Sequence, residues 1–182
     1  MKGSVLEGGA MRGMYTAGVL DVLLENGISF DTTVGVSAGA VFGCSFHSKQ
    51  YGRAIRYHKK YCRDKRYMSL KSLITTGDLF GEQFCYHDIP EKLDPFDSKA
   101  FSENPGEFYA VTTDVNSGKP LYYLCKNGMR DDLEWMRASA SMPLVSRIVR
   151  KDGYEMLDGG ISDSIPVEWM INKGAEKIVL VL

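Results

Sequence analysis

The sequence lacks a hydrophobic run long enough to cross a bilayer. Its longest apolar runs fall far short of the roughly 20 residues that a membrane-spanning helix needs. The chain opens on a glycine-rich loop, whereas a secretory signal would place a charged stretch and an apolar core there. We therefore expect neither a membrane span nor a signal peptide.

The sequence also lacks any Cys-x-x-Cys pair. Its 4 cysteines are widely spaced, which argues against a zinc site and against a redox motif. We expect no metal and no cofactor, and we expect free thiols in a reducing cytoplasm. These cysteines are Cys44, Cys62, Cys85 and Cys125.

A net charge of one sign is nearly absent, with 22 Lys plus Arg against 23 Asp plus Glu. With 44% hydrophobic residues, this balance disfavours a disordered chain, a collagen-like chain and a globally basic nucleic-acid binder. The composition is that of an ordinary globular protein, and no Pro/Gly/Ser-rich linker divides the chain. The sequence predicts one domain over residues 1–182.

One segment departs from that balance. Lys49 to Lys71 holds nine basic residues and the single acid Asp64, so it carries +8 and the remainder −9. The charges suit an anionic membrane surface, with Tyr51, Tyr57, Tyr61 and Tyr67 interleaved among them. The same pattern of basic and aromatic residues could also bind nucleic acid. More commonly such a pattern is simply the solvated face of a helix. We expect peripheral membrane contact here and no nucleic-acid partner.

Strand and helix patterns alternate from the start of the chain. Gly3 to Leu6 is a short apolar strand pattern, followed by a glycine-rich loop and by apolar residues at helical spacing up to Asn26-Gly27. The β-branched run Thr32 to Val36 meets a small-residue turn before a second helix, Ala38 to Ser48. Two βα units predict a three-layer α/β/α fold with a mainly parallel central sheet.

The rest of the chain predicts a mixture of elements. Lys177 to Leu182 has the apolar composition of a buried parallel strand, yet no turn follows it, so truncation after Leu182 stays open. We expect Asp64 to Asp97, which is irregular or short-helical, to form a flap outside the sheet. The other expected elements are a helix at Gln50 to Arg63, a hairpin of Phe108 to Val115 and Leu121 to Lys126, a helix at Asp132 to Ala140, a strand at Tyr154 to Leu157 and a helix at Ile165 to Asn172.

The strongest local signal is Gly35-Val36-Ser37-Ala38-Gly39, a Gly-x-Ser-x-Gly between a strand pattern and a helix pattern. That context is typical of a nucleophile elbow, in which a strained backbone lifts the serine hydroxyl out of the sheet. The hydroxyl then lies at a helix N-terminus, where the dipole favours a developing anion. Ser37 is therefore the candidate nucleophile, and a chance match in a tight turn is the alternative.

A second glycine-rich turn, Glu7 to Gly13, follows the first strand. Its backbone N–H groups can converge on one point and stabilise the oxyanion of an acyl transfer, one donor being worth about 3 to 4 kcal/mol. A phosphate-binding loop and a plain structural turn are the alternatives. A nucleotide fold is disfavoured because Ala10 replaces the third glycine and no Gly-Lys-Ser/Thr follows.

A third signal is Asp158-Gly159-Gly160, directly after a predicted strand. An acidic side chain there can reach across the carboxyl edge of a parallel sheet toward Ser37 and act as its base, although a simple Asp-Gly turn is the commoner meaning. A hydrolase with the order serine, acid, histidine would need a later histidine. His47, His58 and His87 all precede the aspartate, so a Ser-Asp dyad remains unless a histidine follows Leu182 in a longer chain.

These three motifs, in this order, resemble the patatin-like phospholipases. The resemblance extends to Ala138 to Pro143 and to Asp158 to Val167, so it spans essentially the whole chain. The departures are Ala10 and Ser164, which stands where the family usually has asparagine.

The resemblance implies that Ser37 is the nucleophile, that Asp158 is its base, and that the amides around Gly8, Gly9 and Ala10 hold the oxyanion. It implies a serine esterase or lipid acyl hydrolase that acts on a phospholipid or another lipid ester. A catalytically weak lipid- or membrane-binding module of the same fold is the alternative.

Arg12 either fixes the loop or meets a phosphate head group, or else it pairs with an acid such as Glu7 or Asp163. For Ala10 we predict a negative φ, the region open to residues with a Cβ.

Overall fold

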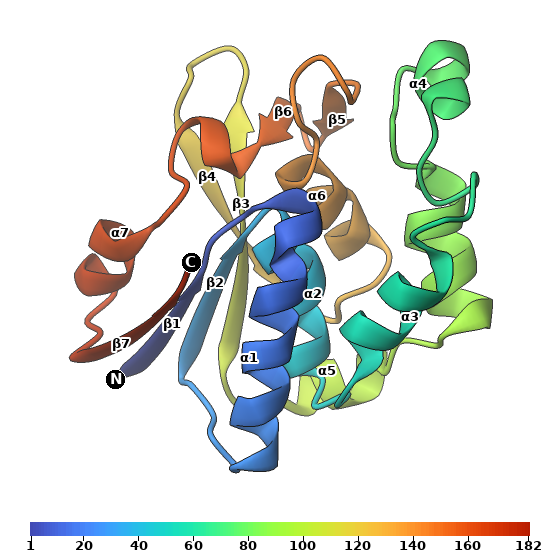
Figure 1. Ribbon diagram of the computed structural model, residues 1–182. Coiled ribbons are helices and arrows are strands. Elements are labelled where there is room, and N and C mark those ends of the chain that lie inside the picture. The colour runs from blue at the N-terminus through green and yellow to red at the C-terminus, as the bar shows by residue number, and fades with distance from the viewer.

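The computed structural model describes residues 1–182, and its seven strands form one sheet (Figure 1). The strand order is β5-β6-β3-β2-β1-β7, with β4 paired to β3. The strands are β1 (Lys2–Leu6), β2 (Thr32–Val36), β3 (Glu107–Asp114), β4 (Pro120–Cys125), β5 (Val149–Lys151), β6 (Tyr154–Asp158) and β7 (Lys177–Val181).

The sheet has a parallel half and an antiparallel half. Strands β3, β2, β1 and β7 run parallel, as the two early βα units predict. The hairpin adds β4 antiparallel to β3, and β6 and β5 add two further antiparallel pairings. The prediction of a mainly parallel sheet thus describes β3, β2, β1 and β7, whereas the hairpin strand β4 and the pair β5 and β6 run antiparallel.

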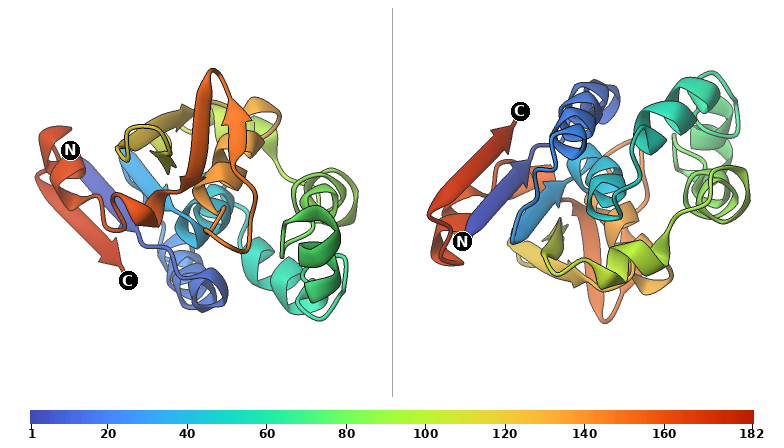
Figure 2. Two further views of the ribbon diagram at one scale, coloured as in Figure 1. Left: turned by 90° about the horizontal axis from the view of Figure 1, so that it is seen from above. Right: turned by 90° about the horizontal axis from the view of Figure 1, so that it is seen from below.

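Helices cover both faces of the sheet, so the three layers are confirmed (Figure 2). Along β3, Phe108 and Ala110 pack on the side of α2 and α6, whereas Tyr109 and Val111 pack with Met170 of α7 on the other. The helices are α1 (Gly13–Glu25), α2 (Ala38–His47), α3 (Arg53–Tyr61), α4 (Leu70–Thr76), α5 (Ser98–Glu103), α6 (Asp131–Ser139) and α7 (Val167–Asn172). Shorter turns are the 3₁₀ segments η1 (Ala10–Arg12) and η3 (Gly159–Ile161), and η2 (Phe84–Leu93) is a π-helix.

Strand β7 differs from its prediction. It pairs parallel with β1 as expected, but it lies at the edge of the sheet. Its apolar residues Val179 and Leu180 are 40% and 44% exposed, so the expectation of a buried strand is wrong. An apolar run alone does not distinguish an edge strand from a central one, because both can be Val/Leu-rich.

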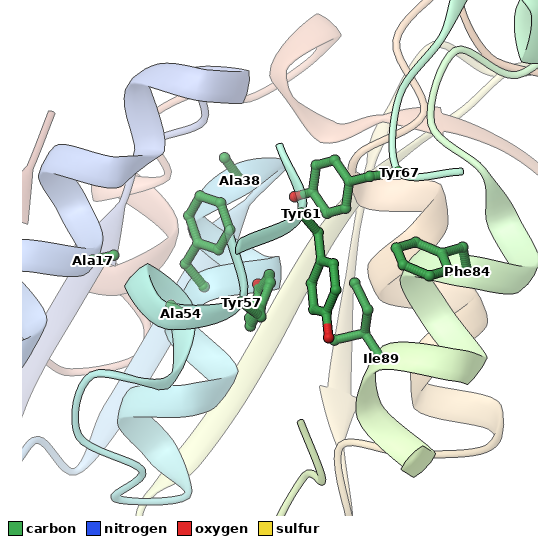
Figure 3. Packing of buried hydrophobic residues seen from close by; sticks show 9 residues of the cluster. Ala17, Ala38, Ala54, Tyr57, Tyr61, Tyr67, Phe84 and Ile89 are labelled. Carbon is green, nitrogen blue, oxygen red and sulfur yellow. The ribbon is translucent and has the colours of Figure 1, made fainter. Parts of the chain in front are cut away.

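The flap, Asp64 to Asp97, lies outside the sheet as predicted. It contains α4 and η2, and its one β-type pairing is the isolated bridge between Met68 and Phe80. Figure 3 shows how flap residues such as Tyr67 and Phe84 pack against α3. No helix of the structure has both the length and the hydrophobicity needed to cross a bilayer.

The same packing corrects the expectation for the tyrosines of the basic segment. Tyr57, Tyr61 and Tyr67 are only 6 to 7% exposed and belong to the apolar cluster between α2, α3 and the flap (Figure 3). Only Tyr51 is exposed, at 57%. Tyr57 and Tyr61 lie on the inner face of α3, and Tyr67 follows in the chain after that helix. These three rings are core side chains and cannot meet a membrane.

Candidate active site

Ser37 sits at the turn between β2 and α2, where the sequence predicted a nucleophile elbow. Its φ of 54° and ψ of −121° lie outside the regions that residues with a Cβ favour, which costs roughly 1–3 kcal/mol. The turn is held in place because the Ser37 amide donates to Ser139 Oγ at 2.9 Å. Backbone strain is thus present at the residue that the sequence predicts to be the nucleophile.

Both glycines of Gly-x-Ser-x-Gly are required by close backbone packing. A Cβ on Gly35 would lie 2.6 Å from the amide nitrogen of Ala40, and one on Gly39 would lie 2.3 Å from the carbonyl oxygen of Leu6. Because neither backbone atom can move freely, a side chain at either position would push α2 away from the sheet. The motif therefore fixes how α2 starts against β1.

Sheet register brings Asp158 to Ser37. Strand β4 occupies one side of β3 along residues 108–113, so β2 and β6 must share the other side. There β2 pairs parallel up to Val36 opposite Val111, and β6 pairs antiparallel up to Asp158 opposite Thr112. The carboxyl ends of the two strands consequently meet head to head at adjacent positions of β3. The sequence predicted that Asp158 would reach Ser37 across the carboxyl edge of parallel strands. In the structure β6 runs antiparallel to β3, and Asp158 approaches Ser37 from the opposite direction.

Asp158 is buried, at 6% exposed, and hydrogen bonds hold it in place. Its Oδ1 accepts the Gly160 amide at 2.8 Å, and its own amide donates to the Ser141 carbonyl at 2.8 Å. Burial raises the pKa of Asp158, while hydrogen bonds from the Ser37 side chain and the Gly160 amide oppose that rise. A carboxylate beside the serine hydroxyl with an elevated pKa is a stronger base than an exposed one.

The loop between β1 and η1 lies directly over Ser37. A Cβ on Gly8 would be 2.8 Å from Ser37 Cβ and 3.5 Å from its Oγ, so only glycine allows this approach. The amides of Gly8, Gly9 and Ala10 donate no hydrogen bond within the chain. Unpaired amides beside a nucleophile are what an oxyanion hole requires.

Ala10 contradicts the predicted negative φ. Its φ is +48°, close to the left-handed region, whereas Gly9 at φ 160° is near extended backbone. The chain turns sharply from β1 into η1 at this point, and the turn needs a left-handed residue at position 10, where the third glycine of the resembled motif would stand. Ala10 therefore carries the strain that a third glycine would avoid.

Arg12 is exposed and bends back over Gly9. A Cβ on that glycine would lie 3.6 Å from the Arg12 Nε. Arg12 forms no ion pair with Glu7 or Asp163, and Asp163 instead accepts the Tyr122 hydroxyl. The ion-pair alternative is therefore wrong, and a role in loop support or head-group contact stays a prediction.

A narrow cavity of about 120 Å³ opens beside Ser37 and extends along α2 under the flap. Mostly apolar and tyrosine side chains line it, and no sequence pattern predicted that tyrosines of α3 and the flap would face it. The side chains around it include Val41, Phe42, Tyr57, Tyr67, Phe80, Tyr86, Leu133, Met136 and Met142.

The histidines take structural positions. His47 is buried against Phe101 and Phe108, and burial lowers its pKa to about 4. His58 borders the cavity, where its Nδ1 lies 3.1 Å from the Tyr67 hydroxyl, and burial lowers its pKa as well. Nowhere in the chain do three or more His, Cys, Asp or Glu side chains converge as metal ligands.

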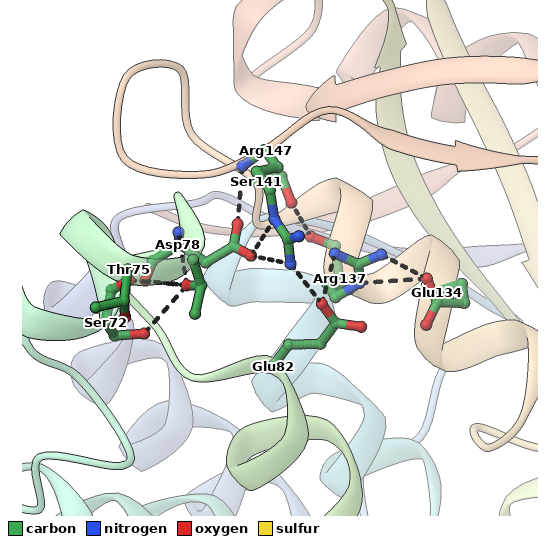
Figure 4. A network of polar contacts seen from close by, with 9 residues as sticks. Ser72, Thr75, Asp78, Glu82, Glu134, Arg137, Ser141 and Arg147 are labelled. Atoms are coloured by element: carbon green, nitrogen blue, oxygen red, sulfur yellow. Dashed lines mark hydrogen bonds and ion pairs between the residues drawn. The ribbon is translucent and has the colours of Figure 1, made fainter.

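Ion pairs hold the flap at the cavity mouth (Figure 4). Arg147 donates to Asp78 at 2.7 Å and to Glu82 at 3.1 Å. Glu82 also pairs with Arg137 of α6 at 3.4 Å, and Arg137 pairs with Glu134 at 2.7 Å. The flap is thus tied to the segment between Ser141 and β5 by charge and to α3 by aromatic packing.

Comparison with known proteins agrees with this geometry. The sequence model of the patatin-like phospholipase family matches residues 5–171. The uncharacterized protein YjjU of Escherichia coli K12 is 30% identical over 97% of this chain and 50% of its own length. The lysophospholipase nte1 of Aspergillus oryzae is 28% identical over 98% of this chain and 11% of its own length.

Structural comparison supports the same fold. VipD from Legionella pneumophila superposes with a TM-score of 0.50 over 89% of this chain and 46% of its own, at 15% identity. The chain spans half or less of the length of these relatives. Because the family model covers most of the sequence, the chain belongs to the patatin-like phospholipase family.

Proposed function

We propose that the protein is a serine hydrolase of lipid carboxylic esters that works through Ser37 and Asp158. The observation that supports this proposal most is the head-to-head meeting of β2 and β6, with backbone strain at Ser37 and a buried carboxyl at Asp158. The relatives named lysophospholipase support the substrate class.

The chemistry requires two displacements. Asp158 accepts the Ser37 proton as Oγ attacks the ester carbonyl, and the unpaired amides of Gly8 and Gly9 stabilise the oxyanion. Collapse expels the alcohol, which takes the proton from Asp158, and leaves an acyl group on Ser37. Water then gives a proton to Asp158 as it attacks the acyl-enzyme, and collapse releases the acid while Asp158 returns that proton to Ser37 Oγ.

A lipid surface is the proposed source of substrate. In the basic segment Arg53 is buried, and Arg56 and Arg66 pair with Asp94 and Asp64. Six cations stay exposed and free of ion pairs, and α4, which contains Lys71, exposes Leu70 at 72% and Ile74 at 84%. Cations beside protruding apolar side chains are suited to an anionic bilayer surface. The six are Lys49, Lys59, Lys60, Arg63, Lys65 and Lys71.

A fluorophosphonate probe tests the proposal directly. We expect the probe to label the wild-type protein at Ser37, as located by peptide mass spectrometry, and not to label Ser37→Ala. Release of fatty acid from phospholipid or lysophospholipid vesicles should parallel the labelling. Vesicle binding without labelling or turnover would favour the alternative, a lipid-binding module without catalysis.

A further inference from the structure

The cavity beside Ser37 contains a buried cation at its far end. Arg53, the first residue of α3, borders this cavity and is only 3% exposed. Its guanidinium carbon lies 5.2 Å from the ring centroids of both Tyr57 and Phe96. A permanently charged group therefore faces a space that is otherwise mostly apolar.

The hydrogen-bonding capacity of Arg53 is only partly used. Its Nε and Nη2 donate to the Asp94 carbonyl at 3.2 and 2.8 Å, and Nη1 donates to Ser45 Oγ at 3.2 Å. A guanidinium has five N–H donors, so two remain without a partner in the chain. Buried donors left unpaired cost free energy, and a ligand that accepts from them recovers it.

The charge of Arg53 is also only partly compensated. The Asp94 carboxylate accepts two 2.7 Å hydrogen bonds from Arg56, whereas its nearest approach to Arg53 Nε is 3.6 Å. The Asp94 carboxylate is thus engaged mainly by Arg56, which leaves the positive charge of Arg53 only partly compensated. The neighbouring Cys44 and Tyr57 do not supply an anion, because burial raises the pKa of each.

The distance from Ser37 to this cation corresponds to a medium acyl chain. Ser45, which accepts from Arg53, follows Ser37 by eight residues along α2, or about 12 Å at 1.5 Å per residue. We infer that the cavity takes an acyl group whose far end carries a carboxylate, so that the preferred substrates are half-esters of medium-length dicarboxylic acids. This inference rests on the proposed hydrolase function.

Discrimination follows from the cost of burying charges. A carboxylate loses its hydration in the cavity, and only charge-assisted hydrogen bonds to Arg53 offset that loss. A methyl end of equal length leaves the two donors unpaired. We therefore expect a dicarboxylic half-ester to exceed the matching monocarboxylic ester at least about tenfold in kcat/KM.

The test compares two esters of equal chain length. Wild-type protein should hydrolyse mono-4-nitrophenyl octanedioate at least about tenfold better than 4-nitrophenyl octanoate. Arg53→Met should lose or invert this preference, measured as the ratio of the kcat/KM values for the two esters. Lys59→Gln, which removes an exposed cation from the same helix, should keep the wild-type preference for the octanedioate ester. Equal ratios in wild type and Arg53→Met, or a wild-type preference for octanoate, would overturn the inference.

A binding experiment separates this inference from the proposed function and does not require Arg53→Met to fold. Calorimetric titration of Ser37→Ala with octanedioate and with octanoate should show tighter binding of octanedioate. Selective binding without turnover of either ester by the wild type would support the anion site and count against the hydrolase. Turnover of both esters with no selectivity in rate or binding would overturn the anion site and leave the hydrolase standing.

Discussion

The loops around Ser37 and the flap that covers them are built by different physical means. The turns at Ser37 and Asp158 are fixed by backbone contacts, because carbonyl or amide atoms lie where a side chain on Gly35, Gly39 or Gly159 would collide, and Gly8 packs against Ser37 Cβ. The flap is held by side chains, through the aromatic cluster on α3 and the ion pairs of Arg147 and Arg137.

This difference predicts how each region responds to change. Backbone contacts at 2.3 to 2.8 Å leave no room for an added methyl group, so substitutions in the loops should remove activity. The flap ion pairs are partly exposed and individually weak, Arg147 being 54% exposed, so substitutions there should alter substrate access and leave the chemistry in place.

The largest effect is expected at the dyad. Ser37→Ala and Asp158→Asn should each lower kcat on a chromogenic ester by at least about 10³-fold, because both groups serve the same proton transfer. The double variant should lose little more than either single variant. If Asp158→Asn keeps wild-type turnover, Asp158 is not the base.

A smaller loss is expected from Gly8→Ala. The new Cβ would lie 2.8 Å from Ser37 Cβ and displace the amides above the serine, with a loss of about 10²-fold in kcat. The matched control is Gly18→Ala in α1, where an added Cβ meets nothing within 4 Å. The control should keep full activity and gain up to about 1 kcal/mol in the free energy of unfolding. Equal activity of the two variants would remove the loop from the site.

The pH profile should report the raised pKa of Asp158. Because the base must be ionised, kcat/KM should fall about tenfold per unit of pH below a midpoint above the ordinary value of 3.8. The folded state binds this proton more tightly than the unfolded state, so ionisation of Asp158 should lower stability as the pH rises from 3.8 through the raised pKa. Asp158→Asn should remove that part of the dependence. A midpoint near 6.5 would instead point to a histidine base.

The flap should govern access to lipid. Replacing Leu70 and Ile74 by serine should lower hydrolysis of lipid in anionic vesicles about tenfold. Each substitution removes about 1 kcal/mol or less of the free energy of binding to the bilayer, because an apolar contact is lost. Hydrolysis of a soluble ester should not change. Val22→Ser, on α1 and 55% exposed, is the control. Equal losses on vesicles and on soluble ester would show that α4 acts on the fold and not on lipid contact.

The same contrast explains what the sequence could predict. The βα units, the elbow at Ser37 and the hairpin were predictable because glycines and alternating apolar residues act locally. The direction of β6 was not, because it depends on the side of β3 that β4 leaves open. The burial of Tyr57 and Tyr67 was also missed, since composition does not reveal which face of a helix a distant flap covers.

The smallest effect is expected from Ala10→Gly. Ala10 has φ +48°, which costs an alanine roughly 1–2 kcal/mol, and glycine would remove most of that strain. Glycine also makes the unfolded chain more flexible, which offsets about 0.4–1 kcal/mol, so the net gain in unfolding free energy should be about 1 kcal/mol or less. Urea denaturation measures it against Ala17→Gly, inside α1 and 2% exposed, which should lose about 1 kcal/mol. Ester hydrolysis by Ala10→Gly should stay near the wild-type rate because no donor is lost. If Ala10→Gly is destabilised as much as Ala17→Gly, the loop does not adopt the left-handed turn, and the approach of Gly8 to Ser37 must be reconsidered.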